Sequence, residues 1–105
     1  MEKILCSAIW YEKLPVVNTE IDNSVILPKN IKSGFVICGF RHHHCIILKS
    51  ILTGKRDAEC GEHIQGFLTN KNRFIDRIAG AIIASKSGQI KEISHGQRLY
   101  SEDLY

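Results

Sequence analysis

The sequence predicts a small α+β domain, in which an antiparallel sheet packs against two short helices. The chain has 105 residues, the length of one domain, and 44% of them are hydrophobic, as in an ordinary globular protein. Extended and helical patterns alternate along the chain, with turn residues between them. We therefore interpret residues 1–105 as a single ligand-binding domain.

Three stretches have the pattern of strands. Residues 3–11 carry apolar side chains on both faces, which is typical of a strand buried on both sides. Residues 14–32 hold both prolines and lack a clear period, so we expect a long excursion around a short extended piece at 24–27. The stretch SGFVICGFR at 33–41 predicts a second strand, and residues 63–69 predict a third.

The first helix is predicted to begin at His42, where the pattern changes from that of a strand to a helical spacing of 3.6 residues. It ends at Gly54, because glycine readily takes the left-handed conformation that closes a helix. Residues 55–62 are polar and read as a loop. The side chains that repeat every 3.6 residues, and so predict the apolar face of this helix, are His44, Ile47, Leu48 and Ile51.

A turn at 70–72 and an extended piece at 73–75 precede the second helix. Asp76 is its predicted N-cap, since a carboxylate there can accept a hydrogen bond from a free backbone N–H. The helix stops at Gly88. Its apolar residues are Ile78, Ala79, Ile82 and Ile83.

Charge and composition restrict the partners. A net charge of +3 is too small to predict binding to a nucleic-acid polymer but suits a small anionic ligand. The start, MEKILCSAIWYEK, is too short and too charged for a signal or membrane-spanning segment, so we expect no membrane association. In a reducing compartment the cysteines would be free thiols, with Cys6 and Cys38 packed as small hydrophobic side chains.

The stretch GFRHHHC at 39–45 raises two chemical alternatives. A zinc site could use His42, Cys45, Cys60 and His63, but the chain lacks the two paired clusters that structural zinc prefers. A Cys–His pair could act in nucleophilic catalysis, yet no other catalytic motif accompanies it. We therefore expect neither a metal nor a cofactor, and no enzyme activity.

Anion binding accounts for more of the sequence. Arg41 lies between a strand and the start of a helix, where free N–H groups and an arginine together suit phosphate. Arg77 has the same setting at the second helix. Phe67 and Phe74 flank the 70–72 turn and could stack on a base, although phenylalanines are more often core residues. The turn residues Asn70 and Asn72 could bond a base edge or a ribose hydroxyl, although asparagine is also a common turn former.

Four motifs resemble one known family. GFRHHHC (39–45), QGFLTNKNRFIDR (65–77), SGQI (87–90) and LYSEDLY (99–105) are similar to the phage Thoeris anti-defence family, first type, and cover about a third of the chain in the same order. The resemblance implies a protein that is not an enzyme. It would bind and sequester, without cleaving, cyclic ADP-ribose isomers made by TIR-domain proteins. It would be a sponge in the cytoplasm of the infected bacterium, and a homo-oligomer, either a dimer or a hexamer built as a trimer of dimers.

The resemblance also implies roles for single residues. Arg41 and Arg77 would clamp the pyrophosphate of the ligand, with His42 and His43 as further hydrogen-bond donors. Asn70 or Asn72 would meet the ribose hydroxyls. The adenine would stack on one aromatic side chain, namely Phe67, Phe74 or Trp10.

The sequence departs from the family pattern at two places. His44 stands where the family has a short polar residue, and Ile78, Ala79 and Gly80 replace a polar stretch, which puts ligand choice and the oligomer contact in doubt. Three alternatives stay open. They are sequestration of cyclic di- or trinucleotides, a small metal-binding adaptor, and an enzyme that cleaves the signal.

Overall fold

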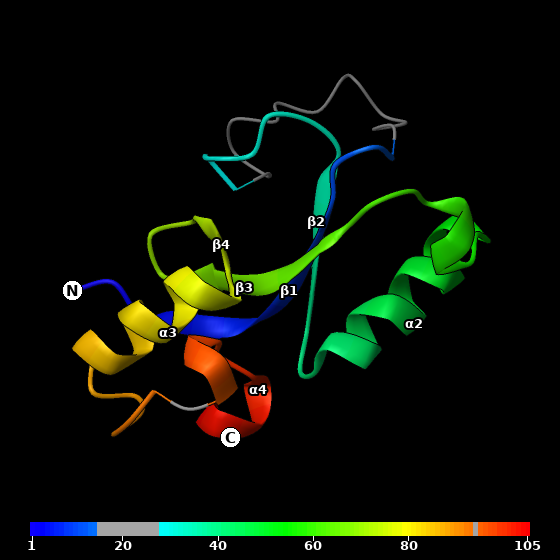
Figure 1. Cartoon of the computed structure of the whole chain (residues 1–105). Helices are drawn as coiled ribbons and strands as arrows, with labels where there is room; N and C mark the ends of the chain where they lie inside the picture. Colours follow the sequence, from blue (N-terminus) through cyan, green and yellow to red (C-terminus); the bar gives the residue numbers. More distant parts are fainter. Residues whose placement is uncertain (15–27, 94) are drawn as a thin grey trace.

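The computed structural model describes residues 1–14, 28–93 and 95–105. Its centre is a four-stranded sheet in the order β2-β1-β3-β4, antiparallel throughout (Figure 1). The α+β prediction is therefore confirmed. In the described ranges, no helix combines the length and the hydrophobicity needed to cross a bilayer. The strands are β1 (Ile4–Tyr11), β2 (Phe35–Gly39), β3 (Ile64–Thr69) and β4 (Phe74–Asp76).

The pairing register decides which side chains share a face of the sheet. Ser7 on β1 lies opposite Phe67 on β3, and Phe67 lies opposite Ile75 on β4. Ile9 likewise lies opposite Ile37 on β2. Because side chains alternate along a strand, all these residues point to one face. Both long helices, α2 (His42–Thr53) and α3 (Arg77–Lys86), cover that face.

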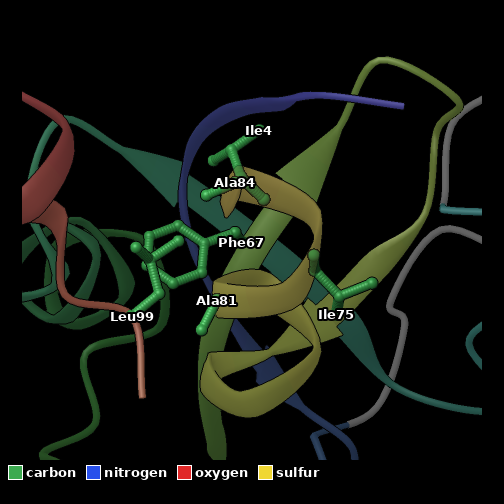
Figure 2. Close-up of a cluster of buried hydrophobic side chains, with 6 residues drawn as sticks. All are labelled: Ile4, Phe67, Ile75, Ala81, Ala84 and Leu99. Carbon is green, nitrogen blue, oxygen red and sulfur yellow. The ribbon is translucent and has the colours of Figure 1, made fainter. Parts of the chain in front are cut away.

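The core has two parts, one under each long helix. Below α3, the Phe67 ring lies among aliphatic side chains from strands, helix and C-terminal segment (Figure 2). The residues of this part are Ile4, Phe67, Ile75, Ala81, Ala84 and Leu99. The second part lies between α2 and the other end of β1. Its residues are Ile9, Tyr11, Leu14, Ile37, Cys45 and Cys60.

Three short elements were not expected from the sequence. They are the 3₁₀ turns η1 (Asp57–Glu59) and η2 (His95–Gln97), and the helix α4 (Ser101–Leu104) near the C-terminus. Each is shorter than two helical turns, too short for a periodic pattern to be visible. The predicted extended piece at 24–27 lies outside the described residues. The predicted strands at 3–11 and 33–41 are each shorter in the structure: β1 starts one residue later, and bends at 33–34 and 40–41 flank β2.

The predicted apolar face of α2 is wrong. Ile47, Leu48 and Ile51 point outward and are exposed, as is His44. The helix instead buries a different row of side chains, which is His42, Cys45 and Lys49. The physical reason is the close fit of Cys45 on the sheet, where its thiol contacts the Ser7 carbonyl oxygen at 3.8 Å.

Candidate anion-binding site

Arg77 is placed by the junction between β4 and α3. Asp76 ends the strand and caps the helix, since its Oδ1 accepts a hydrogen bond from the Ala79 N–H at 2.8 Å. Gly66 faces Asp76 across the β3–β4 pair, so the next residues outward, Gln65 and Arg77, come together. Arg77 Nη2 donates to Gln65 Oε1 at 2.7 Å.

The remaining contacts of the Arg77 guanidinium come from the C-terminal segment and from α2. Its Nη1 donates to the Leu99 carbonyl oxygen at 2.8 Å, and the group lies 4.3 Å from the centroid of the Tyr100 ring. Its Nη2 is also 3.3 Å from Nδ1 of His42. The guanidinium is therefore oriented by three other segments of the chain, which are β3, α2 and the C-terminal segment.

His42 is fixed as a neutral imidazole. Its Nε2 lies 2.8 Å from the Gly66 carbonyl oxygen, which can only accept, so this nitrogen carries the proton. Nδ1 is then an acceptor and receives the hydrogen bond from Arg77. Burial lowers the pKa of His42, which favours the same neutral form. The ring also packs edge-on against Phe67, with 5.2 Å between centroids.

Arg77 carries a positive charge that its hydrogen bonds do not neutralise. In the described part of the chain, its hydrogen-bond partners are an amide, a carbonyl and an imidazole, all neutral. Burial lowers the pKa of Arg77, while the charges of Tyr100 and Glu102 act in the opposite direction. A guanidinium stays protonated in proteins, so the half-buried charge is available to an anion.

A cavity of about 340 Å³ opens beside Arg77. This volume is at the lower end of the range for small-molecule sites. Its wall combines two arginines with polar and aliphatic side chains, and we call it the Arg77 pocket. The lining residues are His63, Ile64, Gln65, Asp76, Arg77, Ile78 and Arg98.

Arg41 does not share this pocket. Its Nη2 donates to the main-chain oxygen of Tyr105, and its guanidinium lies 4.6 Å from the Phe40 ring centroid and 5.0 Å from that of Tyr105. His43 is exposed, with its ring 4.1 Å from that of His44. The predicted clamp of Arg41 with Arg77 is therefore not formed in this structure, because each arginine is held by a different part of the C-terminal segment.

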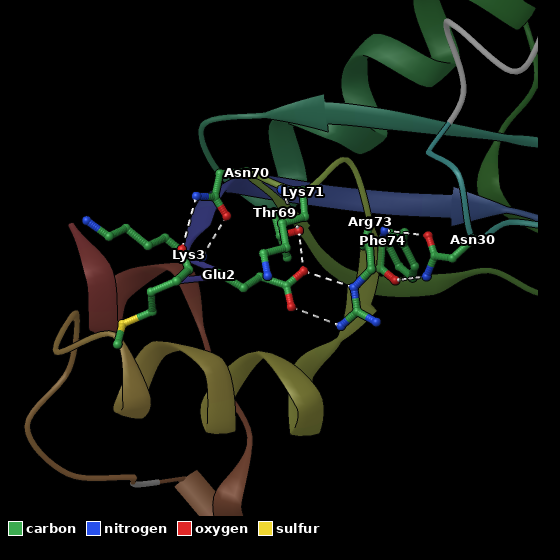
Figure 3. Close-up of polar contacts among 9 residues, drawn as sticks. Glu2, Lys3, Asn30, Thr69, Asn70, Lys71, Arg73 and Phe74 are labelled. Carbon is green, nitrogen blue, oxygen red and sulfur yellow. Dashed lines mark hydrogen bonds and ion pairs between the residues drawn. The ribbon is translucent and has the colours of Figure 1, made fainter.

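The two asparagines serve the β3–β4 turn. Asn70 accepts a hydrogen bond from the Lys3 N–H at 2.8 Å and donates to the Met1 carbonyl oxygen at 3.2 Å (Figure 3). Asn72 has a φ of 56°, the left-handed conformation that asparagine tolerates, and its N–H bonds the Thr69 carbonyl oxygen. Both residues hold the turn and lie away from the Arg77 pocket.

The three aromatic rings predicted to stack on a base make packing contacts within the protein. Phe67 is fully buried at 0% exposure, so no base can reach it. Phe74 is buried, and the Asn30 side chain bonds both its N–H and its carbonyl oxygen (Figure 3). The Phe74 ring packs 6.0 Å from that of Trp10, on the face of the sheet opposite the helices. Phe67 and Phe74 are therefore core residues in this structure, whereas Trp10 is only half-buried and its stacking role stays a prediction.

Of the predicted site residues, the structure brings His42 and Arg77 together. The sequence patterns did not predict most of the pocket wall, including His63, Gln65 and Ile64. Side-chain alternation could have found Gln65, because it lies two residues before Phe67 and so points to the same face of the strand. Arg98 could not be found in this way, since η2 and the segment after it have no periodic pattern.

The cysteines are free, as expected, but two of them are not packed as expected. Cys38 is exposed and Cys6 is only half-buried, on the sheet face without helices. A hydrogen bond from Cys38 lowers the pKa of the Cys6 thiol to about 7. Among the described residues, no three histidine, cysteine or acidic side chains are grouped so that they could hold a metal ion.

Comparison with known protein families matches the chain to a phage family. A family model described as phage T4 y16D protein matches residues 3–105. The match covers every described strand and helix and all residues of the Arg77 pocket. No curated protein and no solved structure matches the chain.

Proposed function

We propose that this chain, which belongs to the phage T4 y16D protein family, binds a small phosphate-bearing ligand in the Arg77 pocket and holds it intact. The ligand we propose is a cyclic ADP-ribose isomer made by a TIR-domain defence protein. Holding it would keep the signal from its effector and so block Thoeris immunity in the cytoplasm of the infected bacterium. The resemblance of four sequence motifs to Thoeris anti-defence proteins supports this choice of ligand.

One observation supports a ligand that bears a phosphate. The Arg77 guanidinium lies at the wall of a cavity and has neutral hydrogen-bond partners in the described residues. A phosphate would add a negatively charged hydrogen-bond acceptor, and charge-assisted hydrogen bonds are stronger than neutral ones. Partial burial strengthens this attraction, because the local dielectric is lower than in water.

The other pocket residues suit the rest of such a ligand. Arg98 adds a second cation, which a pyrophosphate with two negative charges would use. Ile64 and Ile78 offer apolar contact to a ribose or a base, and Gln65 and His63 offer hydrogen bonds to hydroxyl groups. The carboxylate of Asp76 already accepts the Ala79 N–H as the helix cap.

The test is a binding measurement followed by release. Purified protein is titrated with a TIR-generated cyclic ADP-ribose isomer by calorimetry, and the ligand is then recovered by heating and analysed by chromatography. We expect Arg77→Ala to weaken binding by roughly 10- to 150-fold, the range for a hydrogen bond to a charged group. Arg56→Ala is the matched control, because Arg56 is exposed and pairs with Glu59.

Three outcomes would contradict parts of the proposal. Equal affinity of wild type and Arg77→Ala for the ligand would show that the ligand does not bind in the Arg77 pocket. Recovery of linear ADP-ribose in place of the cyclic isomer would indicate an enzyme. If a cyclic di- or trinucleotide binds more tightly in competition, the proposed ligand is wrong, whereas the Arg77 pocket remains the proposed binding site.

A further inference from the structure

Cys6 and Cys38 lie on neighbouring strands and face the same side of the sheet. In the register of β1 and β2, Ala8 is opposite Cys38, and Cys6 lies two residues before Ala8. Because side chains alternate along a strand, all three residues share one face. Ile37, the neighbour of Cys38, packs with Cys45 of α2 in the core, so the shared face is the one without helices. The two thiols are therefore diagonal neighbours across the β1–β2 pair.

The two sulfur atoms are in contact, and both can be reached from solvent. The Cys38 S–H donates a hydrogen bond to the Cys6 sulfur. Cys38 is exposed and Cys6 is half-buried, whereas Cys45 and Cys60, which are also free thiols, are buried. Accessible thiols that touch each other can be oxidised to a disulfide, whereas buried cysteines are inert.

The hydrogen bond makes the two thiols chemically different. It lowers the pKa of Cys6 to about 7, because the donor stabilises the thiolate. At pH 7 about half of Cys6 is therefore thiolate, which is the form that attacks oxidants. The same bond raises the pKa of Cys38, which keeps its proton while Cys6 is charged. On the other face of the sheet, burial raises the pKa of Cys45 to about 11.

We propose that Cys6 and Cys38 form a peroxide-sensitive pair, in which a hydroperoxide oxidises Cys6 and Cys38 then converts the product to a disulfide within one chain. Redox-sensing cysteines have this arrangement, with an accessible thiolate next to a second thiol that resolves it. The site is separate from the Arg77 pocket, which lies at α3 and the C-terminal segment.

The reaction proceeds in two balanced steps. The Cys6 thiolate attacks one oxygen of hydrogen peroxide, so that an S–O bond forms and the O–O bond breaks. The sulfur is oxidised to a sulfenic acid, and the departing hydroxide takes up a proton to become water. Cys38 no longer faces a negative charge and can lose its proton. Its sulfur attacks the Cys6 sulfur, the S–S bond forms, the S–O bond breaks, and a second water leaves.

The disulfide is expected to be reversible. Diagonal neighbours in a sheet are typically about 7–8 Å apart, which is near the upper limit of the Cα separation for a disulfide. Strained or exposed disulfides are reduced more readily than buried structural ones. A small dithiol should therefore return both cysteines to thiols.

The experiment treats the reduced full chain, freed of reductant, with hydrogen peroxide in slight excess at pH 7. Remaining thiols are alkylated in denaturant, and intact mass and peptide maps locate the oxidised cysteines. We expect wild type to lose two thiols together and to yield peptides linked through Cys6 and Cys38. Dithiothreitol should restore both thiols, and a non-reducing gel should show single chains.

Two variants assign the separate roles. Cys6→Ser is expected to leave Cys38 reduced at the same dose, because the reactive thiolate is absent. Cys38→Ser lacks the resolving thiol, so Cys6 should stop at the sulfenic acid, which dimedone traps. Cys60→Ser is the matched control, since Cys60 is buried in the core, and it should form the disulfide like wild type. Circular dichroism checks that each variant folds.

A measurement on wild type alone keeps the proposal testable if a variant fails to fold. Under native conditions iodoacetamide should modify Cys6 roughly 10-fold faster than Cys45 at pH 7, because an accessible thiolate is the reactive form. The rate at Cys6 should rise with pH and level off, with a midpoint at about pH 7.

Several results would overturn the proposal. They are wild type that keeps all its thiols under peroxide, and oxidation that begins at Cys45 or Cys60. Cys6 that ends as a sulfinic acid beside a reduced Cys38, or disulfides that join different chains, would also contradict it. None of these results depends on whether a cyclic ADP-ribose isomer binds.

Discussion

At the scale of single residues, His42 links the fold to the candidate site. One ring nitrogen holds the Gly66 carbonyl oxygen of β3, and the other accepts a hydrogen bond from Arg77. A protonated ring would lose that acceptor and place a second cation beside the guanidinium. The sequence suggested His42 as a donor to the ligand, but its buried position makes it a support for Arg77 instead.

This role predicts a pH dependence of stability. Burial lowers the pKa of His42 in the folded state from its ordinary value of 6.5. As the pH falls, the unfolded chain therefore binds a proton at His42 more readily than the folded chain does. The contribution of neutral His42 to the free energy of unfolding is complete above pH 6.5 and is lost as the pH falls through the folded pKa. Urea midpoints of wild type are expected to drop between about pH 7 and pH 5.

Two variants separate this effect from the titration of other groups. His42→Gln cannot titrate in this range and should flatten the pH profile. His43→Gln removes an exposed histidine and should leave the profile as in wild type. An unchanged slope in His42→Gln would assign the pH dependence to another residue.

At the level of secondary-structure elements, the N-cap residue Asp76 fixes the start of α3. Asp76 caps the backbone N–H of Ala79 and is the last residue of β4, so the strand passes into the helix with no loop. This abrupt junction sets the direction of Arg77. The corresponding cap of α2 is Arg41, whose side chain packs on Phe40 and Tyr105.

Removing the Asp76 cap separates stability from anion binding. Asp76→Ala is expected to lower the free energy of unfolding by about 1 kcal/mol, because one N–H of the first turn loses its acceptor. Asp76→Asn keeps an acceptor and should lose less. Binding of an anionic ligand to Asp76→Asn should be at least as tight as to wild type, since a carboxylate has left the pocket wall. Weaker binding to Asp76→Asn would point to a ligand group that needs this carboxylate.

At the scale of the whole molecule, the ends of the chain complete the packing. Gln89, after α3, bonds both the N–H and the carbonyl oxygen of Ile4 with its side-chain amide. Leu99 is fully buried in the part of the core below α3, which also contains Ile4. Glu2 pairs with Arg73 at 2.9 Å and accepts from Thr69, which together lower the pKa of the carboxyl. These contacts join segments that are more than 65 residues apart in the sequence.

Phe67 lies at the centre of this packing and supplies a prediction that distinguishes a core residue from a stacking platform. It contacts His42 edge-on, and any side chain at Gly80 would meet its ring at 3.0 Å. Phe67→Ala is expected to cost about 3–5 kcal/mol of unfolding free energy, measured in urea, and Phe67→Leu clearly less. A stable Phe67→Ala protein with reduced ligand affinity would restore the predicted stacking role.

Local patterns in the sequence predicted the strands, both long helices and the Asp76 cap. These features depend on local causes, namely side-chain alternation, 3.6-residue spacing and capping chemistry, which neighbours along the chain reveal. Long-range packing determines which face of α2 is buried. It also places Arg41 against Tyr105 and Arg77 beside Gln65 and His42. The reason is that strand register and the docking of the C-terminal segment bring together residues with no shared local pattern, so their contacts exist only once the sheet has formed.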